Sequence, residues 1–108
     1  MPNLASVFGY VNASWTLRAD LVARYVCRIL EHMDRVGAVE CTPRLRPQDS
    51  TMRPLRWIEG FTPGYWNRYM DHLPRQGDHA PWINPQVYRR DRRLFLPAPI
   101  DNGAMQFR

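Results

Sequence analysis

The sequence contains no lysine, so all fifteen of its basic residues are arginine. It has only two cysteines, Cys27 and Cys41, and their spacing matches neither a CxxC pair nor a zinc site. Its three histidines are also isolated from HxxH patterns. No apolar run approaches the ~18 residues that a membrane span requires, and the first residues lack the pattern of a signal peptide. These absences predict reduced thiols, a cytoplasmic location, and neither a metal site nor a membrane partner.

The basic charge is spread along the chain. The formal net charge is +5 and the isoelectric point is about 9.9, which leaves nucleic-acid binding open as a function. The arginines are interleaved with ten acidic residues, however, and only residues 89–93 form a dense arginine group, which Asp91 interrupts. A nucleic-acid binder would use that group, with Tyr88 or Trp82 stacking on bases. The charge pattern makes this function a less favoured alternative.

Proline divides the sequence into two parts. Nine of the ten prolines follow Cys41, and this excludes a simple helical bundle for the second half. We expect residues 1–37 to form one unit and residues 38–108 to form a proline-rich wrapping segment of mostly irregular chain. Within that segment the sequence predicts brief strands at 39–41 and 55–58, a helix at 63–72 after Thr62-Pro63, and a helix from Asn84-Pro85 to about residue 94.

The first 37 residues predict a strand followed by a long helix. Residues 3–10 are mostly apolar, with β-favouring side chains on both faces, as in a buried strand of a parallel sheet. Residues 15–36 carry a helical apolar stripe, and acid–base pairs four residues apart, Asp20 with Arg24 and Glu31 with Arg35, support the helix. Gly37 is a natural C-terminal cap. The apolar stripe consists of Leu17, Leu21, Val22, Tyr25, Val26, Ile29, Leu30 and Met33.

The junction between the predicted strand and helix is the candidate ligand site. Ligands of open α/β sheets bind beyond the carboxyl ends of strands, where unpaired N–H groups at a helix N-terminus favour an anion or an electron-rich carbonyl. Gly9 would allow close approach of the backbone, and Trp15 would supply a flat wall. Asn12, Ser14 and Thr16 offer hydrogen bonds to a ligand or N-caps for the helix. The residues alone leave both interpretations open.

The same junction resembles a known family. The run Gly9-Tyr10-x-Asn12-Ala13-Ser14-Trp15-Thr16-Leu17-x-Ala19-Asp20-Leu21, followed by Tyr25-Val26-Cys27-Arg28, is similar to the C-terminal region of class B flavin-dependent monooxygenases. The branch it resembles most is the ethionamide-activating type of Baeyer–Villiger monooxygenase. The similarity continues in order through Phe61-Thr62-Pro63-Gly64-Tyr65, Leu73-Pro74-x-Gln76-Gly77, Pro81-Trp82 and Tyr88-x-x-Asp91.

The resemblance implies a fold, cofactors and a site. The fold would be an α/β fragment: the last strand–loop–helix unit of an FAD-binding Rossmann-like domain, followed by the proline-rich tail with its short helices. The parent enzyme would bind FAD and NADPH and oxygenate ketones or sulfides through a C4a-peroxyflavin. The junction would line the flavin, with the positive end of the helix dipole directed at the pyrimidine edge of the ring. The residues implied to contact the cofactor are Gly9, Tyr10, Asn12, Ala13, Ser14, Trp15 and Thr16.

Other parts of the family pattern do not occur in the sequence. Its six glycines never approach GxGxxG spacing, and the family's His- and Trp-containing signature and active-site arginine have no match. We therefore expect the C-terminal fragment of a monooxygenase, with no catalytic residue of its own, no bound cofactor and no activity alone. Its expected partner is the rest of the monooxygenase, or a second copy bound through the apolar face of residues 17–33. A non-enzymatic self-associating module is the other alternative.

Overall fold

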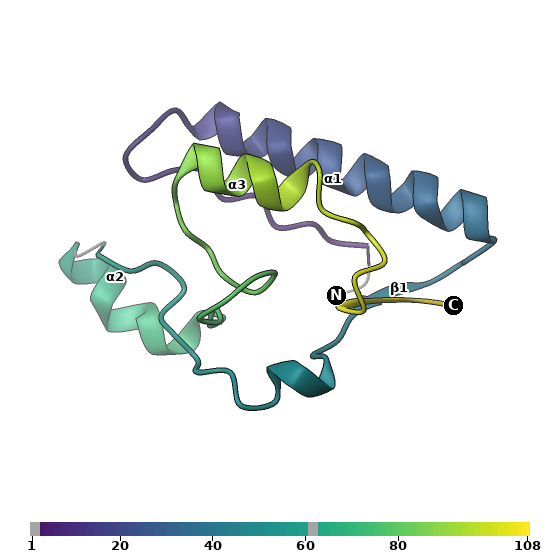
Figure 1. Cartoon of the computed structure of the whole chain (residues 1–108). Coiled ribbons are helices and arrows are strands. Elements are labelled where there is room, and N and C mark those ends of the chain that lie inside the picture. Colours follow the sequence, from purple (N-terminus) through teal and green to yellow (C-terminus); the bar gives the residue numbers. More distant parts are fainter. Residues whose placement is uncertain (1–2, 61–62) are drawn as a thin grey trace.

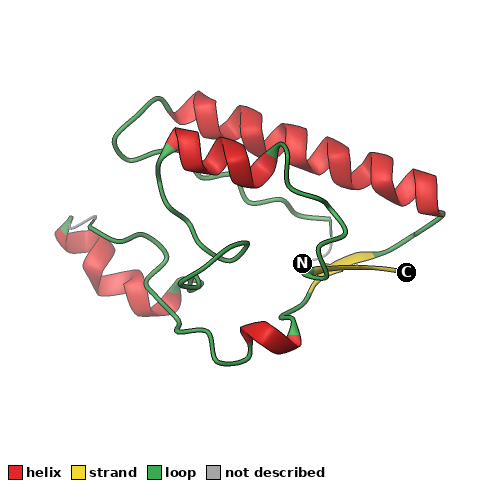
Figure 2. Cartoon of the chain, viewed as in Figure 1, coloured by secondary structure: helices red, strands yellow, loops and turns green. Residues whose placement is uncertain are grey.

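A computed structural model describes residues 3–60 and 63–108 as a small α/β arrangement of helices and one two-stranded sheet, joined by long loops (Figures 1 and 2). The long helix α1 lies along one side with α3 packed against it, and α2 lies at the opposite side (Figure 1). The elements in chain order are α1 (Trp15–Val36), β1 (Cys41–Pro43), the 3-10 helix η1 (Pro47–Asp49), α2 (Gly64–Tyr69), the 3-10 helix η2 (Met70–His72), α3 (Tyr88–Phe95) and β2 (Met105–Phe107).

Helix α1 confirms the helix predicted at residues 15–36. Gly37 ends it in the left-handed region, at φ 70°, and donates its backbone N–H to the carbonyl of Met33. On the exposed face, Arg24 and Asp20 form the expected ion pair at 3.0 Å. These features are local in sequence, which is why the sequence pattern alone could predict them.

The structure does not form the strand predicted at residues 3–10. This segment takes part in neither strand of the sheet, and Leu4 and Val7 are 66% and 44% exposed. A strand needs a neighbour to accept and donate its backbone hydrogen bonds, and the described residues place no strand beside it. Its pairing within a larger Rossmann-like sheet stays a prediction.

The sheet joins the two ends of the wrapping segment. Strand β1 pairs antiparallel with β2, so that Cys41 lies opposite Phe107. The backbone N–H groups of Val39 and Glu40 both donate to the carbonyl of Arg108, at 2.6 and 2.9 Å. The strand predicted at 39–41 is therefore displaced by two residues, to Cys41–Pro43, because its register is set by the C-terminal partner.

The strand predicted at 55–58 is reduced to a single bridge between Leu55 and Gln76. The side chain of Gln76 explains why pairing stops there. Its Nε2 donates to the carbonyls of Arg56 and Trp57, at 2.8 and 3.2 Å, so these acceptors are already occupied by a side chain.

The two short helices were predicted with different success. Helix α2 and its continuation η2 confirm the helix at 63–72, although the expected capping residue Thr62 lies outside the described residues. Helix α3 begins at Tyr88 instead of following Asn84-Pro85. Asn84 does not cap a helix, because its side-chain Nδ2 donates to the carbonyl of Trp57 at 3.0 Å. Gln86 then adopts a left-handed conformation, at φ 53°, which interrupts any helix before α3.

Aromatic rings connect the N-terminal segment to the wrapping segment. The ring of Phe8 lies 4.7 Å from those of both Trp15 and Trp57, centroid to centroid, and 6.0 Å from that of Trp66. The pairs with Trp15 and Trp57 are edge-on, and such pairs contribute more than their buried area alone. The buried apolar side chains of the described residues are Tyr10, Leu21, Ile58, Met70, Ile100 and Ala104.

A buried carboxylate holds the middle of the wrapping segment together. Asp49 accepts hydrogen bonds from the Nε and Nη2 atoms of Arg46, at 2.7 and 2.9 Å, and from the indole of Trp82, at 2.8 Å. Its Oδ1 atom also lies 2.9 Å from Nε2 of His79, whose other ring nitrogen meets Asp78. These bonds, that of Arg46 first, hold the pKa of Asp49 far below its usual range, and Asp49 with Asp78 raises the pKa of His79. We call Arg46, Asp49, His79 and Trp82 the carboxylate clasp.

Candidate functional site

The junction loop, residues 9–16, leads from the extended segment into α1. Its first two residues, Gly9 and Tyr10, are buried, whereas residues 12–16 are exposed at the N-terminal end of the helix. The candidate site residues are thus divided between an inner pair that packs against the chain and an outer group that faces outward.

Among the described helices, none is long and apolar enough to cross a bilayer.

Gly9 has a packing role within the chain, and its predicted contact with a ligand stays a prediction. A Cβ atom at this position would lie 2.7 Å from Cε3 of Trp15 and closer still to two other indole carbons. The missing side chain therefore makes room for the chain's own indole ring, which also contacts Phe8. Trp15 is 49% exposed, so its outer part remains available as the flat wall that the sequence suggests.

Gln86, which lies 75 positions after Val11, binds the junction loop through its side-chain amide. Its Oε1 accepts the backbone N–H of Val11 at 3.1 Å, and its Nε2 donates to the carbonyl of Gly9 at 3.3 Å. One side-chain amide thereby supplies the donor and the acceptor that a neighbouring strand would supply. The sequence analysis missed this residue, because nothing in the local pattern indicates a contact across 75 positions.

A second set of contacts buries Tyr10. Arg18 of α1 lies with its Nε atom 3.6 Å from a carboxylate oxygen of Asp91, and its guanidinium carbon is 5.8 Å from the centre of the Tyr10 ring. The Tyr10 ring also meets Tyr88 edge-on at 6.5 Å. Burial, with Asp91 adding to it, raises the pKa of Tyr10, and burial also raises the pKa of Asp91. The motif residue Asp91 is therefore an inner-side support of the loop, whereas Tyr88 contacts Tyr10 edge-on and keeps its ring partly exposed.

The outer part of the loop leaves the end of α1 available to a ligand. Ser14 occupies the N-cap position, but its side chain makes no capping bond and instead pairs with the hydroxyl of Thr16 at 2.9 Å. The first turn also contains no acidic residue. The first N–H groups of an α-helix have no intrahelical acceptor, and the helix dipole adds positive potential there. The described residues thus fit the electron-rich carbonyl edge of a flavin.

The apolar stripe of α1 is only partly covered. Leu21 is almost completely buried, at 1% exposure, and α3 packs on this side. Leu17 and Leu30 remain 40% and 55% exposed. Within the described chain, therefore, part of the face proposed for a partner is still accessible.

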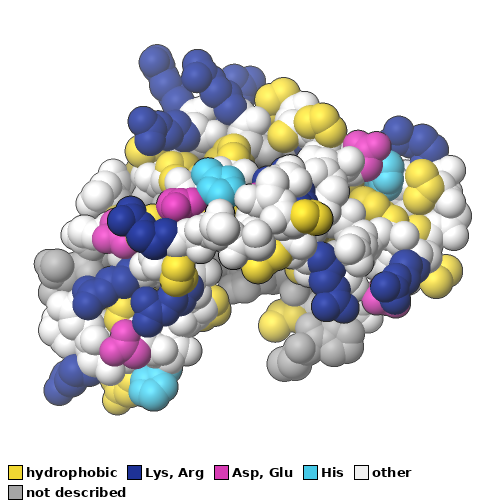
Figure 3. All heavy atoms as spheres, turned by 60° about the horizontal axis from the view of Figure 1, so that its bottom comes forward, with side chains coloured by type: hydrophobic (Ala, Val, Ile, Leu, Met, Phe, Trp, Pro, Cys, Tyr) yellow, Lys and Arg dark blue, Asp and Glu magenta, His cyan; other side chains and the backbone are white. Residues whose placement is uncertain are grey.

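On the face of the molecule shown in Figure 3, the arginines form several separate groups instead of one continuous strip. Among the described residues, four arginines pair with carboxylates, and Arg28 donates to the carbonyls of Phe95 and Ala98. The paired arginines are Arg18, Arg24, Arg46 and Arg75. This distribution gives no support to an extended nucleic-acid interface.

Comparison with known proteins places the chain among sequences of one class. Over 99% of its length, it is homologous to FAD-containing or FAD-binding monooxygenases, at identities of 37–44%. This confirms the resemblance that the junction residues carry. No protein-family profile matches the chain, and no solved structure is similar to it.

Three relatives illustrate the match. The FAD-containing monooxygenase EthA of Mycobacterium tuberculosis is 44% identical over 107 residues, and the putative FAD-containing monooxygenase MymA of the same organism is 41% identical over 106 residues. The probable FAD-binding monooxygenase AlmA of Acinetobacter baylyi is 40% identical over 108 residues. The alignments cover 98–99% of this chain but 21% of each relative, so the chain spans about a fifth of the length of the curated relatives it matches.

Proposed function

We propose that the chain acts as the C-terminal part of an FAD- and NADPH-dependent monooxygenase, to which it contributes part of the flavin pocket. The observation that carries this proposal is the homology of nearly the whole chain to FAD-containing monooxygenases, in each of which it matches about a fifth of the length. The parent enzyme would oxygenate ketones in the Baeyer–Villiger manner, or sulfides. We further propose a cytoplasmic location, in keeping with two free cysteines.

The junction loop would hold the flavin through its outer residues. The N–H groups at the start of α1 and the side chain of Asn12 would donate to the pyrimidine edge of the ring, and Trp15 would shield that edge from water. FAD, when bound, supplies the electron transfer and the activation of O₂. The inner residues of the chain position the loop: Gly9 makes room for Trp15, and Gln86 fixes the backbone at Gly9 and Val11.

The same proposal makes the isolated chain inactive. Its described residues would contribute the N-terminal end of α1 to the flavin pocket, and the rest of the enzyme would form the remaining walls. That partner would cover the extended segment at residues 4–8 and the exposed stripe residues Leu17 and Leu30. Self-association through the same stripe is the second candidate function, and the exposure of these two leucines is the observation that favours it.

A chimeric enzyme tests the proposal. In it, the matching 107-residue segment of Mycobacterium tuberculosis EthA is replaced by this chain. We expect the chimera to purify with FAD and to oxidise NADPH, whereas the 108-residue chain alone should be colourless and inactive. In the chimera, Asn12→Leu should reduce FAD content and the coupling of NADPH oxidation to product. Gln106→Leu, an exposed position on β2, is the matched control.

Two results would contradict this assignment. An unchanged FAD content and unchanged coupling in the Asn12→Leu chimera would show that the loop does not line the flavin. Stoichiometric FAD binding or substrate turnover by the chain alone would show that the site is complete within these residues. Concentration-dependent dimerisation that Leu30→Asp abolishes would instead support the self-associating module.

A further inference from the structure

We propose that the outer face of α3 binds a small organic phosphate that carries a flat ring. The site is an open hollow of 720 Å³, which we call the α3 groove. Its lining residues are Tyr88, Arg89, Arg92, Arg93, Leu96 and Pro97. Asp91, which pairs with Arg18, does not line the groove, and the proposal does not depend on the flavin assignment.

The charge of the groove is unbalanced. Helix α3 has a single acid, Asp91, which is buried at 1% exposure and paired with Arg18 of α1. Arg89, Arg92 and Arg93 are exposed, and none of them forms an ion pair with a described residue. Three guanidinium groups on one short helix repel one another, and a multivalent anion between them removes that repulsion.

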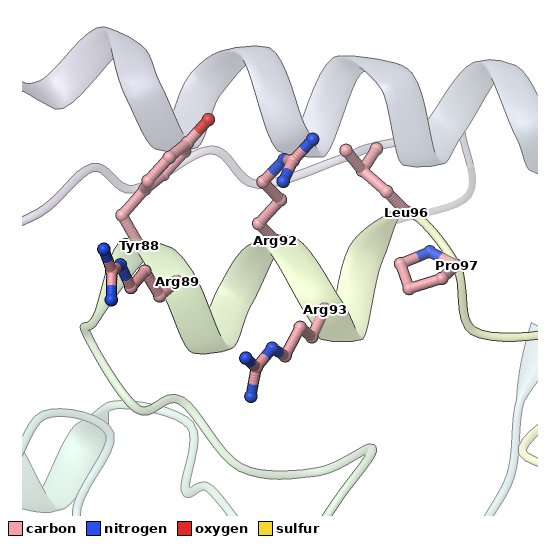
Figure 4. Close-up of a pocket in the computed structure, with 6 residues that line it drawn as sticks. All are labelled: Tyr88, Arg89, Arg92, Arg93, Leu96 and Pro97. Carbon is pink, nitrogen blue, oxygen red and sulfur yellow. The ribbon is translucent and has the colours of Figure 1, made fainter.

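The arrangement of the side chains suits a phosphate group. Figure 4 shows Tyr88, Arg92 and Leu96 along the edge of α3 nearer α1, with Arg89 and Arg93 along the other edge. Guanidinium groups offer paired N–H donors that match phosphate oxygens better than a point charge does. Donors on both edges of one helix can therefore bind different oxygens of the same phosphate or diphosphate.

The groove is larger than a bare phosphate requires. A volume of 720 Å³ lies within the range of sites for organic ligands, about 300–1,000 Å³. The exposed ring of Tyr88 borders one end, and the apolar side chains of Leu96 and Pro97 border the other. An aromatic ring at the edge of an arginine cluster can stack on the flat ring of the ligand, beside its phosphates.

The extent of the basic surface favours a small ligand over a polymer. An eight-residue helix is about 12 Å long at the usual rise per residue, which is enough for a diphosphate and one ring. Outside α3, Arg18, Arg24, Arg46 and Arg75 pair with carboxylates, and on the face shown in Figure 3 the arginines lie in separate groups. A nucleic acid would need further free cations along its backbone.

The test uses the full 108-residue chain and adenosine diphosphate as the probe, with binding measured by isothermal titration calorimetry. We expect adenosine diphosphate to bind, inorganic pyrophosphate to bind more weakly, and adenosine not to bind. Arg92→Gln and Arg93→Gln should each weaken binding by about tenfold or more, because each removes a charge-assisted hydrogen bond. Arg90→Gln is the matched control: it removes the same charge from the same helix, outside the groove, and should change affinity by less than about threefold.

Each outcome decides the matter. Circular dichroism establishes that the variants remain folded, and Arg93→Lys, which keeps the charge without the paired donors, should give an intermediate affinity. Tyr88→Leu should reduce the affinity for adenosine diphosphate to that for pyrophosphate. Equal losses in Arg90→Gln and Arg92→Gln, equal affinities for pyrophosphate and adenosine diphosphate, or no binding at all would overturn the proposal. Tighter binding of a long single-stranded oligonucleotide than of adenosine diphosphate would overturn it in favour of a nucleic-acid surface.

Discussion

The contact between Gly9 and Trp15 provides a sharp test of how the junction loop is built. In Gly9→Ala, the new methyl group would overlap the indole, with Cε3 only 2.7 Å away. Since Gly9 has no positive φ in this structure, the expected effect comes from packing alone. The ring must move toward solvent and give up its contact with Phe8, and an aromatic pair of this kind is worth about 0.5–1.5 kcal/mol.

We expect Gly9→Ala to lower the free energy of unfolding by about 1–3 kcal/mol, which is typical of an overpacked site. The assay is urea denaturation of the chain, followed by far-UV circular dichroism, where this loss corresponds to a shift of about 1 M in the midpoint. Gly64→Ala is the matched control, because a Cβ at this helical position meets nothing within 4 Å. It should raise stability by up to about 1 kcal/mol.

Combining Gly9→Ala with Trp15→Ala separates the overlap with the indole from any other effect of the new methyl group. If the methyl group acts by displacing the indole, Gly9→Ala should have little effect once the indole is gone, and the double-mutant cycle should show the difference. The reasoning fails if Gly9→Ala stabilises the chain as Gly64→Ala does, or if its effect is the same with and without Trp15.

Two further predictions concern the bonds that hold the wrapping segment. The carboxylate clasp should give the free energy of unfolding a plateau between an acid and an alkaline decline. Because the pKa of Asp49 is lowered, its stabilising contribution is present above its ordinary pKa of 3.8 and is lost as the pH falls toward its pKa in the folded chain. Because the pKa of His79 is raised, its contribution is complete below its ordinary pKa of 6.5 and is lost as the pH rises through its pKa in the folded chain. Urea midpoints measured from acid to mildly alkaline pH check this, and His79→Gln should flatten the alkaline decline but not the acid one. Gln86→Ala should lower stability by about 1–3 kcal/mol, since it leaves the Val11 N–H and the Gly9 carbonyl without this partner, and an equal loss in the exposed control Gln106→Ala would refute the assignment.

Features with a local cause could be predicted from the sequence. Helix α1 ends at Gly37 as expected, because the apolar period and the glycine cap act within a few residues of one another. The helix at 63–72 was predicted from signals that are equally local, the Thr62-Pro63 start and the stop at Pro74.

Features with a distant cause could not be predicted. The start of α3 depends on Asn84, whose side chain is bound to the carbonyl of Trp57 and is not free to cap. The role of Gly9 depends on where the indole of Trp15 turns, and the support of the loop depends on Gln86 and Asp91. A sequence read in short windows contains no sign of these tertiary contacts. The predicted domain boundary at residue 37 and the Rossmann-like unit remain predictions.

The hydrogen bond between Val11 and Gln86 gives the molecule an internal reporter. The Val11 amide is protected only while the side chain of Gln86 remains bound to it, so its hydrogen-exchange rate measures how often the segment that carries Gln86 detaches from the junction loop. Anything that tightens docking would slow exchange at this single amide, even at a distance from the loop. Loosening of the segment that carries Gln86 would in turn release the backbone at Gly9 and Val11, which precede α1.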